Sequence, residues 1–148
     1  MSIHKSKGLE FPIVILAGAH KSINFMDATA PVLVDQNLGI AVDYVDLERR
    51  TKTPTIIKGA MARRIVRESI SEEERLLYVA MTRAREKLII TGVVKDADKT
   101  LEKYRGSAKQ LEADGMLSYA DSENIKNYLD MIMPVSYTHL RAHETDQY

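Results

Sequence analysis

Two short apolar runs rich in β-branched residues constrain the fold of this chain more than any other feature. Residues 11–18 are FPIVILAG and residues 87–94 are KLIITGVV. Runs of this length and composition are typical of strands that are buried on both faces of a parallel sheet. Pro12 is compatible with such a strand because proline is tolerated near its first residue. A long helical pattern separates the two runs, so the sequence predicts an α/β fold, a parallel sheet with flanking helices.

The segment between residues 19 and 55 carries weaker signals. It predicts two short strands, Val32–Asp35 and Ile40–Tyr44, on either side of an Asn-Leu-Gly turn. Thr51–Thr55 contains Pro54 and is predicted to be a loop. No strong periodicity is visible in this part of the chain.

Helical periodicity begins at Ile56, where apolar residues recur at steps of three and four. Ser71 is followed three residues later by Glu74, which is a capping-box pattern. This pattern favours a break at Ser71 between two helices over one long kinked helix. Two further amphipathic helices are predicted at Ala97–Glu112 and Ser122–Met133.

Residues 135–148, VSYTHLRAHETDQY, are set aside from the fold prediction. With suitable codons most of this segment back-translates to a transposon-end adapter used in sequencing libraries, so we expect it not to be native. We also expect the gene to be truncated at this end and before Met1. His139 and His143 lie in this segment, and their spacing is therefore not taken as a metal site. No metal ligands are predicted in this chain.

Composition excludes several classes of protein. The 148 residues carry 21 basic and 21 acidic side chains, so any contact with nucleic acid must come from a local patch. The absence of cysteine excludes disulfides and thiolate metal sites. No apolar stretch approaches the roughly 20 residues of a membrane span, and no signal peptide is visible. We therefore expect a cytoplasmic protein.

The segment Ile3–Glu10, IHKSKGLE, concentrates polar groups that suit an anionic ligand. A serine hydroxyl, two ammonium groups and a glycine that permits close backbone approach can all meet phosphate oxygens. His4 can donate to a phosphate or stack on a base, whereas the carboxylate of Glu10 suits a hydroxyl group or a cation. A solvated turn before a strand explains the same composition equally well.

A second polar group follows the helical pattern in EERLLYVAMTRAREK, residues 73–87. Arg83 lies at the end of a helix, from which its guanidinium could reach a transferring phosphate across an interface. The residues alone favour a plainer interpretation, in which Arg83 and Arg85 offset the helix dipole and Tyr78 belongs to the core. The P-loop pattern GxxxxGK[ST] is absent, so any nucleotide chemistry needs groups from elsewhere.

Taken together, the two segments resemble a known family. SIHKSKGLEFPIVIL resembles motif V of UvrD/Rep-type superfamily 1 DNA helicases, and EEERLLYVAMTRAREKLIITG resembles their motif VI. The intervening NFMDATAPVLVDQNLGIAVDYVDLERRTKTPT is similar to the corresponding region of AddA-type helicase/nuclease subunits. The resemblance implies that residues 1–95 are part of the second RecA-like motor domain and that residues 96–134 form a helical extension.

The resemblance also implies roles for individual residues. In the family, ATP lies between two motor domains, and the first domain carries the Walker lysine and the Mg²⁺ ligands. By resemblance, Gly8 and Glu10 face the nucleotide, with Glu10 at the ribose. Arg83 is the catalytic arginine finger at the γ-phosphate and also contributes to ATP binding. His4 and Ser6 lie near the DNA track, while Arg75 and Tyr78 would support the cleft rather than contact ATP.

The function implied by the resemblance is ATP-dependent 3′→5′ DNA helicase/nuclease activity in double-strand break repair and recombination. The expected partners are DNA and a second subunit of the AddB type. The 148 residues alone are expected to be inactive and marginally stable. Two alternatives stay open: a UvrD/PcrA-like helicase without a nuclease, and a non-catalytic α/β module that binds DNA or a partner.

Overall fold

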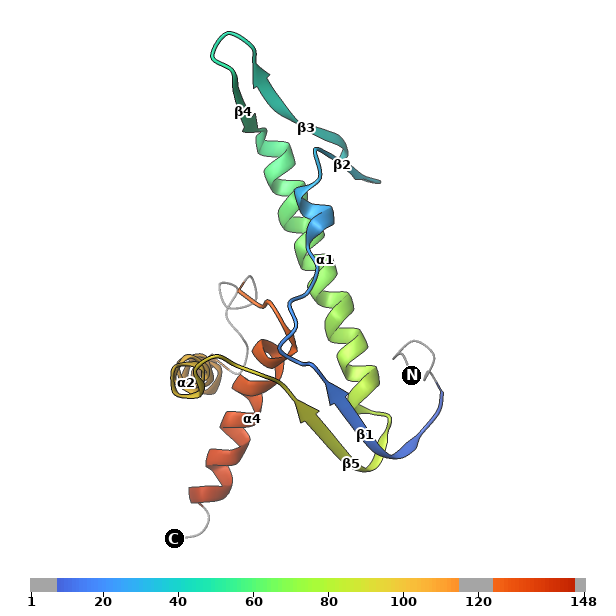
Figure 1. Ribbon diagram of the computed structural model, residues 1–148, viewed down its shortest axis with the longest axis vertical. Helices are drawn as coiled ribbons and strands as arrows, with labels where there is room; N and C mark the ends of the chain where they lie inside the picture. Colours follow the sequence, from blue (N-terminus) through green and yellow to red (C-terminus); the bar gives the residue numbers. More distant parts are fainter. Residues whose placement is uncertain (1–7, 115–123, 146–148) are drawn as a thin grey trace. The chain divides into compact units, whose positions relative to one another are not determined.

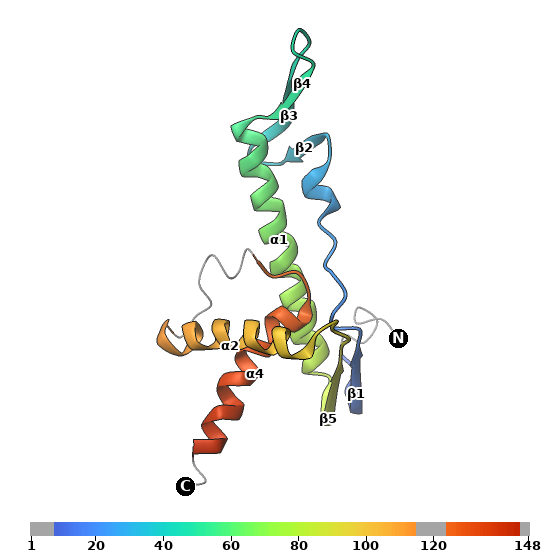
Figure 2. The ribbon, with the colours of Figure 1, turned by 60° about the vertical axis from the view of Figure 1, so that its left-hand side comes forward.

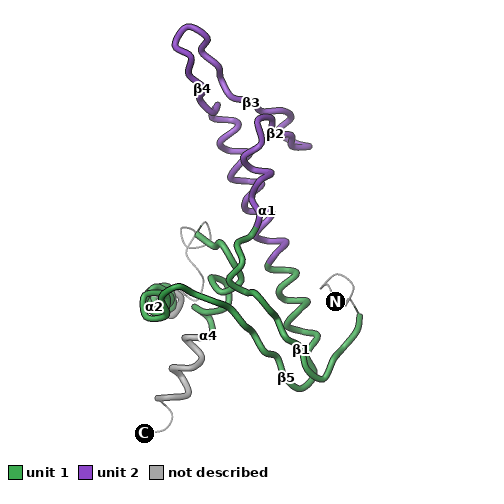
Figure 3. The backbone as a smooth tube through the Cα atoms, viewed as in Figure 1, with its two compact units in different colours: residues 1–23, 74–148 green, residues 24–73 purple. Residues whose placement is uncertain are grey.

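The computed structural model describes residues 8–114 and 124–145. Two compact units divide the chain (Figure 3). The first unit comprises residues 1–23 and 74–148, and the second unit comprises residues 24–73.

The first unit is built on two parallel strands, β1 (Phe11–Ala17) and β5 (Ala84–Thr91), which lie side by side (Figure 1). The register pairs Phe11 with Ala84 and Ala17 with Thr91. The ladder is irregular between Phe11 and Ile13, where Pro12 has no N–H to donate. The predicted parallel sheet with helices is thus confirmed, and its two strands are the two apolar runs.

Two details of these strands differ from the prediction. The strand β1 is not buried on both faces, because Ile13 and Ile15 are more than half exposed while Leu16 is buried. The strand β5 begins and ends three residues before the predicted 87–94 run. It ends at Thr91 because the chain then leaves the ladder, and the N–H of Val93 donates to Nδ1 of His20 at 3.1 Å.

The helix α1 (Ile56–Met81) is continuous, and the predicted break at Ser71 is wrong. Serine costs only a few tenths of a kcal/mol in a helix interior, and the glutamates that follow are good helix formers. The apolar side also continues past the serine, since Ile70 and Leu77 are both buried. The first turn is capped by Thr55, whose Oγ1 accepts the N–H of Lys58 at 3.3 Å.

The second unit contains a short 3₁₀ helix, η2 (Met26–Thr29), and an antiparallel sheet in the order β2–β3–β4. The strands are β2 (Val32–Asp35), β3 (Gly39–Asp46) and β4 (Thr51–Pro54). The two predicted strands are therefore present, and β3 extends beyond the predicted Ile40–Tyr44. The predicted loop at Thr51–Thr55 is wrong, because four of its residues pair with β3.

Similar aspartate-capped turns join these strands. Asp35 Oδ1 accepts the N–H groups of Asn37 and Leu38, at 2.8 and 2.9 Å, and Gly39 follows with a positive φ of 80°. Asp46 Oδ1 accepts two N–H groups in the same way, both at 3.0 Å. A side-chain oxygen that caps a turn fixes the hairpin without an apolar contact. Leu33, Ala41 and Met61 form the small buried core of the unit, which joins the sheet to α1.

Two more helices complete the first unit. The helix α2 (Ala97–Asp114) confirms the predicted helix at Ala97–Glu112. The helix α4 (Tyr128–Thr145) begins later than the predicted Ser122, and residues 122 and 123 lie outside the described residues. It also continues through Pro134 into the segment set aside from the prediction, so that segment does continue a helix. Figure 2 shows α2 and α4 packed against each other.

The structure is therefore a mixed α/β fold with a parallel pair of strands and helices, and it adds a separate antiparallel sheet. Within residues 8–114 and 124–145, no helix combines the length and the apolar character needed to cross a membrane.

Candidate functional site

Residues of the two polar motifs meet at the amino ends of β1 and β5. Glu10 directly precedes β1 and Arg83 directly precedes β5, so the register that pairs Phe11 with Ala84 brings them to the same end. The N–H of Phe11 donates to the carbonyl of Arg83 at 2.9 Å. The side chain of Arg83 also donates a hydrogen bond to the carbonyl of Leu9, 74 positions earlier in the sequence.

The end of α1 positions the Arg83 side chain. Thr82 closes the helix, since its Oγ1 donates to the carbonyls of Tyr78 and Val79 at 2.9 and 3.1 Å. The Arg83 guanidinium then spans the gap between the helix end and the other motif. Its Nε donates to the Val79 carbonyl at 3.2 Å and its Nη1 to the Leu9 carbonyl at 3.3 Å.

The charge of Arg83 is held by neutral oxygens. Besides the two carbonyls, Nη2 donates to Thr82 Oγ1 at 3.3 Å, and Arg83 is half-buried. Within residues 8–114 and 124–145 no carboxylate lies close enough to form an ion pair with Arg83. A half-buried guanidinium that is oriented but not neutralised can still attract an anion. The bond to Val79 also offsets the negative end of the helix, so the plainer interpretation of Arg83 holds as well.

Gly8 and Glu10 lie beside this guanidinium. Gly8 has a φ of 85°, which favours glycine, and an added Cβ would meet no atom within 4 Å. Glycine is therefore favoured at this position by the backbone conformation. The Glu10 carboxylate is exposed and lies 3.7 Å from Nε of Arg85. Arg85, which the sequence interpretation assigned only to the helix dipole, is thus also a partner of Glu10.

The site lies at the amino ends of β1 and β5. Open α/β sheets normally bind their own ligands at the carboxyl ends of the strands. Arg83 and Glu10 lie at the opposite end, so this rule does not place a self-contained ligand site here.

Other predicted site residues have mixed outcomes. His4 and Ser6 lie outside the described residues. The expectation that Tyr78 belongs to the core is wrong, because its side chain is 69% exposed. The buried side of α1 at this level is formed by Leu77 and Ala80 instead. Within the described ranges, no group of three or more histidine or acidic side chains could hold a metal ion.

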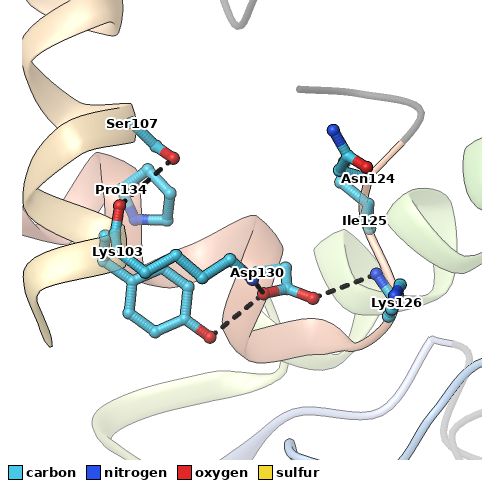
Figure 4. Close-up of a pocket in the computed structure, with 8 residues that line it drawn as sticks. Lys103, Ser107, Asn124, Ile125, Lys126, Asp130 and Pro134 are labelled. Carbon is cyan, nitrogen blue, oxygen red and sulfur yellow. Dashed lines mark hydrogen bonds and ion pairs between the residues drawn. The ribbon is translucent and has the colours of Figure 1, made fainter. Parts of the chain in front are cut away.

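Sequence reasoning missed a polar cluster between α2 and α4 (Figure 4). The carboxylate of Asp130 accepts hydrogen bonds from Lys103 Nζ at 2.6 Å and from Tyr104 Oη at 3.1 Å. Its other oxygen accepts the N–H of Lys126 at 3.0 Å. Burial, followed by the Asp130 charge, raises the pKa of Tyr104. One sequence signal could have placed Asp130 in the first turn of a helix. Asn127 is a common capping residue, it precedes α4, and its side chain accepts the N–H of Asp130 at 3.0 Å.

The described part of the chain is an α/β unit with an arginine and a glutamate at the amino ends of two parallel strands. Residues 1–95 match the UvrD-like helicase C-terminal domain, and the chain belongs to this family. The predicted resemblance to UvrD-type helicases is thus confirmed.

Several relatives at about half identity share one name, that of an ATP-dependent helicase/nuclease subunit of the AddA type. The protein of Clostridium botulinum strain Alaska E43 is 52% identical over 132 residues, which are 89% of this chain and 10% of the relative. That of Clostridium botulinum strain Kyoto is 48% identical over 142 residues, 96% of this chain and 11% of the relative. That of Ruminiclostridium cellulolyticum is 48% identical over 139 residues, 94% and 11% of the two chains. This chain spans about a tenth of the length of these relatives.

Proposed function

We propose that this chain is part of the second RecA-like motor domain of an AddA-type ATP-dependent helicase/nuclease. The proposed whole protein moves 3′→5′ on DNA, acts in double-strand break repair and recombination in the cytoplasm, and works with an AddB-type subunit. The observation that supports this proposal most directly is the hydrogen bond of 3.3 Å from the Arg83 guanidinium to the carbonyl of Leu9, the residue that separates Gly8 from Glu10. Family membership supports a helicase, and the shared name of the relatives supports a helicase/nuclease over a plain helicase.

Arg83 is proposed to act as the arginine finger. Bound ATP supplies the γ-phosphate that is transferred to water, and negative charge on its oxygens must be stabilised as the bond breaks. The guanidinium of Arg83 is oriented by Val79 and Leu9 and has neutral partners, so its charge is available to an approaching phosphate. It lies at the amino ends of the strands, which suits a nucleotide that the first motor domain holds. Domain closure would then bring Arg83 to the γ-phosphate.

Glu10 and Gly8 are proposed to contact the nucleotide away from the γ-phosphate. The exposed carboxylate of Glu10 can accept a hydrogen bond from a ribose hydroxyl, and Arg85 holds it in place. Gly8 leaves open space where a side chain would stand. His4 and Ser6 are proposed to contact single-stranded DNA on the strength of the motif V resemblance. On the strength of the family resemblance, the Mg²⁺ ligands are proposed to lie on the first motor domain.

The test uses the full-length protein with Arg83→Ala. Loss of an arginine finger lowers the turnover number by about 10³–10⁵-fold, and the affinity for ATP should change little because the contact forms mainly in the transition state. Arg63→Ala is the matched control, since Arg63 is an exposed arginine on α1 away from the site. Steady-state ATPase kinetics and equilibrium binding of a nucleotide analogue give the two quantities.

Arg83→Lys separates charge from geometry in the same assay. A lysine keeps the charge but cannot form the forked contact, so we expect most of the loss to remain. Thermal unfolding of each variant checks that the fold survives the loss of the Leu9 contact. Equal losses of turnover and ATP affinity would argue for a ground-state binding role, and unchanged turnover would refute the finger assignment.

A further inference from the structure

The outer face of the β2–β3–β4 sheet is apolar and uncovered. In the register of β2 and β3, Val32 pairs with Val42 and Val34 pairs with Ile40. These four side chains and Tyr44 alternate with the buried Leu33 and Ala41, so they lie on the face away from α1. Val34 and Ile40 are each 70% exposed and Tyr44 is 64% exposed. We call these five residues the outer face.

Two charged side chains of these strands, Asp35 and Asp43, lie on the opposite face, whereas Asp46 at the end of β3 falls in the alternation of the outer face. Asp43 Oδ2 forms ion pairs with Lys58 at 2.7 Å and with Lys52 at 3.0 Å. Asp35 pairs with Arg64 of α1 at 3.4 Å. A solvated antiparallel sheet normally places its polar residues outward and its apolar residues toward the helix. Here these two carboxylates face the helix and the branched aliphatic side chains face outward.

This arrangement indicates that the sheet is covered in the complete protein. A contiguous apolar patch on a monomer marks an interaction site. The outer face presents no cation, and DNA contacts depend on lysine and arginine at phosphates, so DNA is a poor fit to it.

We propose that the outer face packs against an apolar surface from another part of the same polypeptide, outside residues 1–148. The relatives are about ten times longer than the matched segment, so most of such a polypeptide is available to cover it. A surface in the same polypeptide has a high effective concentration at the outer face. Charged groups around the contact are therefore not needed for specificity. The apolar character of these five side chains suits such a permanent contact.

Hydroxyl-radical footprinting of the full-length protein tests this directly. We expect Tyr44 and Ile40 to be protected in the native protein and to become reactive only when it is unfolded. Leu47 follows β3 and is 84% exposed, so it is the control that should react equally in both states. Labelling of Tyr44 at its unfolded rate in the native protein would overturn the proposal. So would protection that appears only in a dimer or only after a separate subunit is added.

A substitution in the full-length protein gives an independent reading. Val34→Lys places a charge on the outer face and should lower the melting temperature of the unfolding transition that exposes Tyr44. Leu47→Lys should leave it unchanged. If Val34→Lys does not fold, Val34→Thr keeps the shape and adds one hydroxyl, and it should still lower the melting temperature measurably. A melting temperature equal to that of the wild type for Val34→Lys would refute the contact.

Discussion

Asp130 allows a sharp test of how α2 and α4 are held together. Its carboxylate is 8% exposed and accepts hydrogen bonds from three donors, the Lys103 ammonium, the Tyr104 hydroxyl and the Lys126 N–H. Tyr104 is itself only 4% exposed. Replacing Asp130 by alanine would therefore leave a buried hydroxyl without its partner.

The expected cost follows from these contacts. Hydrogen bonds to charged groups contribute about 1.5–3 kcal/mol each, and a buried donor left unsatisfied costs about 1–3 kcal/mol. The Lys103 side chain is 57% exposed and can return to water, so its share is discounted. Because no buried charge is left behind, we expect Asp130→Ala to lower the free energy of opening of α2 and α4 by about 2–4 kcal/mol. Asp130→Asn keeps an acceptor oxygen and should cost about 1–2 kcal/mol.

Native-state hydrogen exchange measures this opening helix by helix. The amides of α2 and α4 should exchange faster in Asp130→Ala, and those of the second unit should not change. Glu102→Ala is the matched control, because Glu102 is an exposed carboxylate on α2. An effect of Asp130→Ala below about 0.5 kcal/mol, the range of an ordinary surface substitution, would refute the assigned role.

Two further predictions concern stability. Gly92→Ala would place a Cβ 2.9 Å from Leu129 Cδ1, so it should lower the free energy of unfolding by about 1–3 kcal/mol. Leu129→Ala should relieve part of that loss in a double-mutant cycle measured by urea unfolding. Additive effects of the two substitutions would exclude the contact. Hydrogen bonds from Lys58, and then from Lys52, lower the pKa of the Asp43 carboxyl. Because the pKa of Asp43 is lower in the folded state than in the unfolded state, its ionised carboxylate stabilises the fold at pH values above the ordinary pKa near 4. This stabilisation is lost as the pH falls through the pKa of the folded state. The second unit should therefore weaken in acid, and Asp43→Asn should flatten that pH dependence, as followed by circular dichroism during acid titration.

The strands and helices with strong periodicity were predictable. The composition of FPIVILAG identified β1 within one residue, and the turn-flanked Val32–Asp35 strand is the observed β2. The pairing of β1 with β5 was also predictable, because two strands joined through a long helix are normally parallel. Such signals succeed where one local pattern decides the structure.

The errors arise where tertiary contacts outweigh local patterns. The capping box at Ser71 was a valid local signal, but continuous burial on either side of it keeps α1 in one piece. Pro54 suggested a loop, yet proline is tolerated at the end of an edge strand, where β4 lies. The exposure of Ile13 and Ile15 contradicts a strand buried on both faces. Partners of such residues need not lie in the same 148 residues.

The candidate site was predictable as a meeting of two motifs but not in its contacts. Parallel pairing of β1 and β5 is sufficient to bring Glu10 and Arg83 to the same end of the two strands. The contact of Arg83 with Leu9 depends on the turn at Thr82, and the approach of Arg85 to Glu10 depends on the register at the start of the ladder. Neither detail has a sequence signal of its own.

The order of elements explains why the site can exist at all. Parallel neighbours need a long crossover connection, and between β1 and β5 it contains both the second unit and α1. The contacts of Arg83 involve only the last turn of α1 and the residues next to β1. The second unit can therefore carry a separate packing surface without altering the geometry of the site. The motif edge and the outer face are thus two independent features of one chain, and the experiments on Arg83 and Val34 can fail separately.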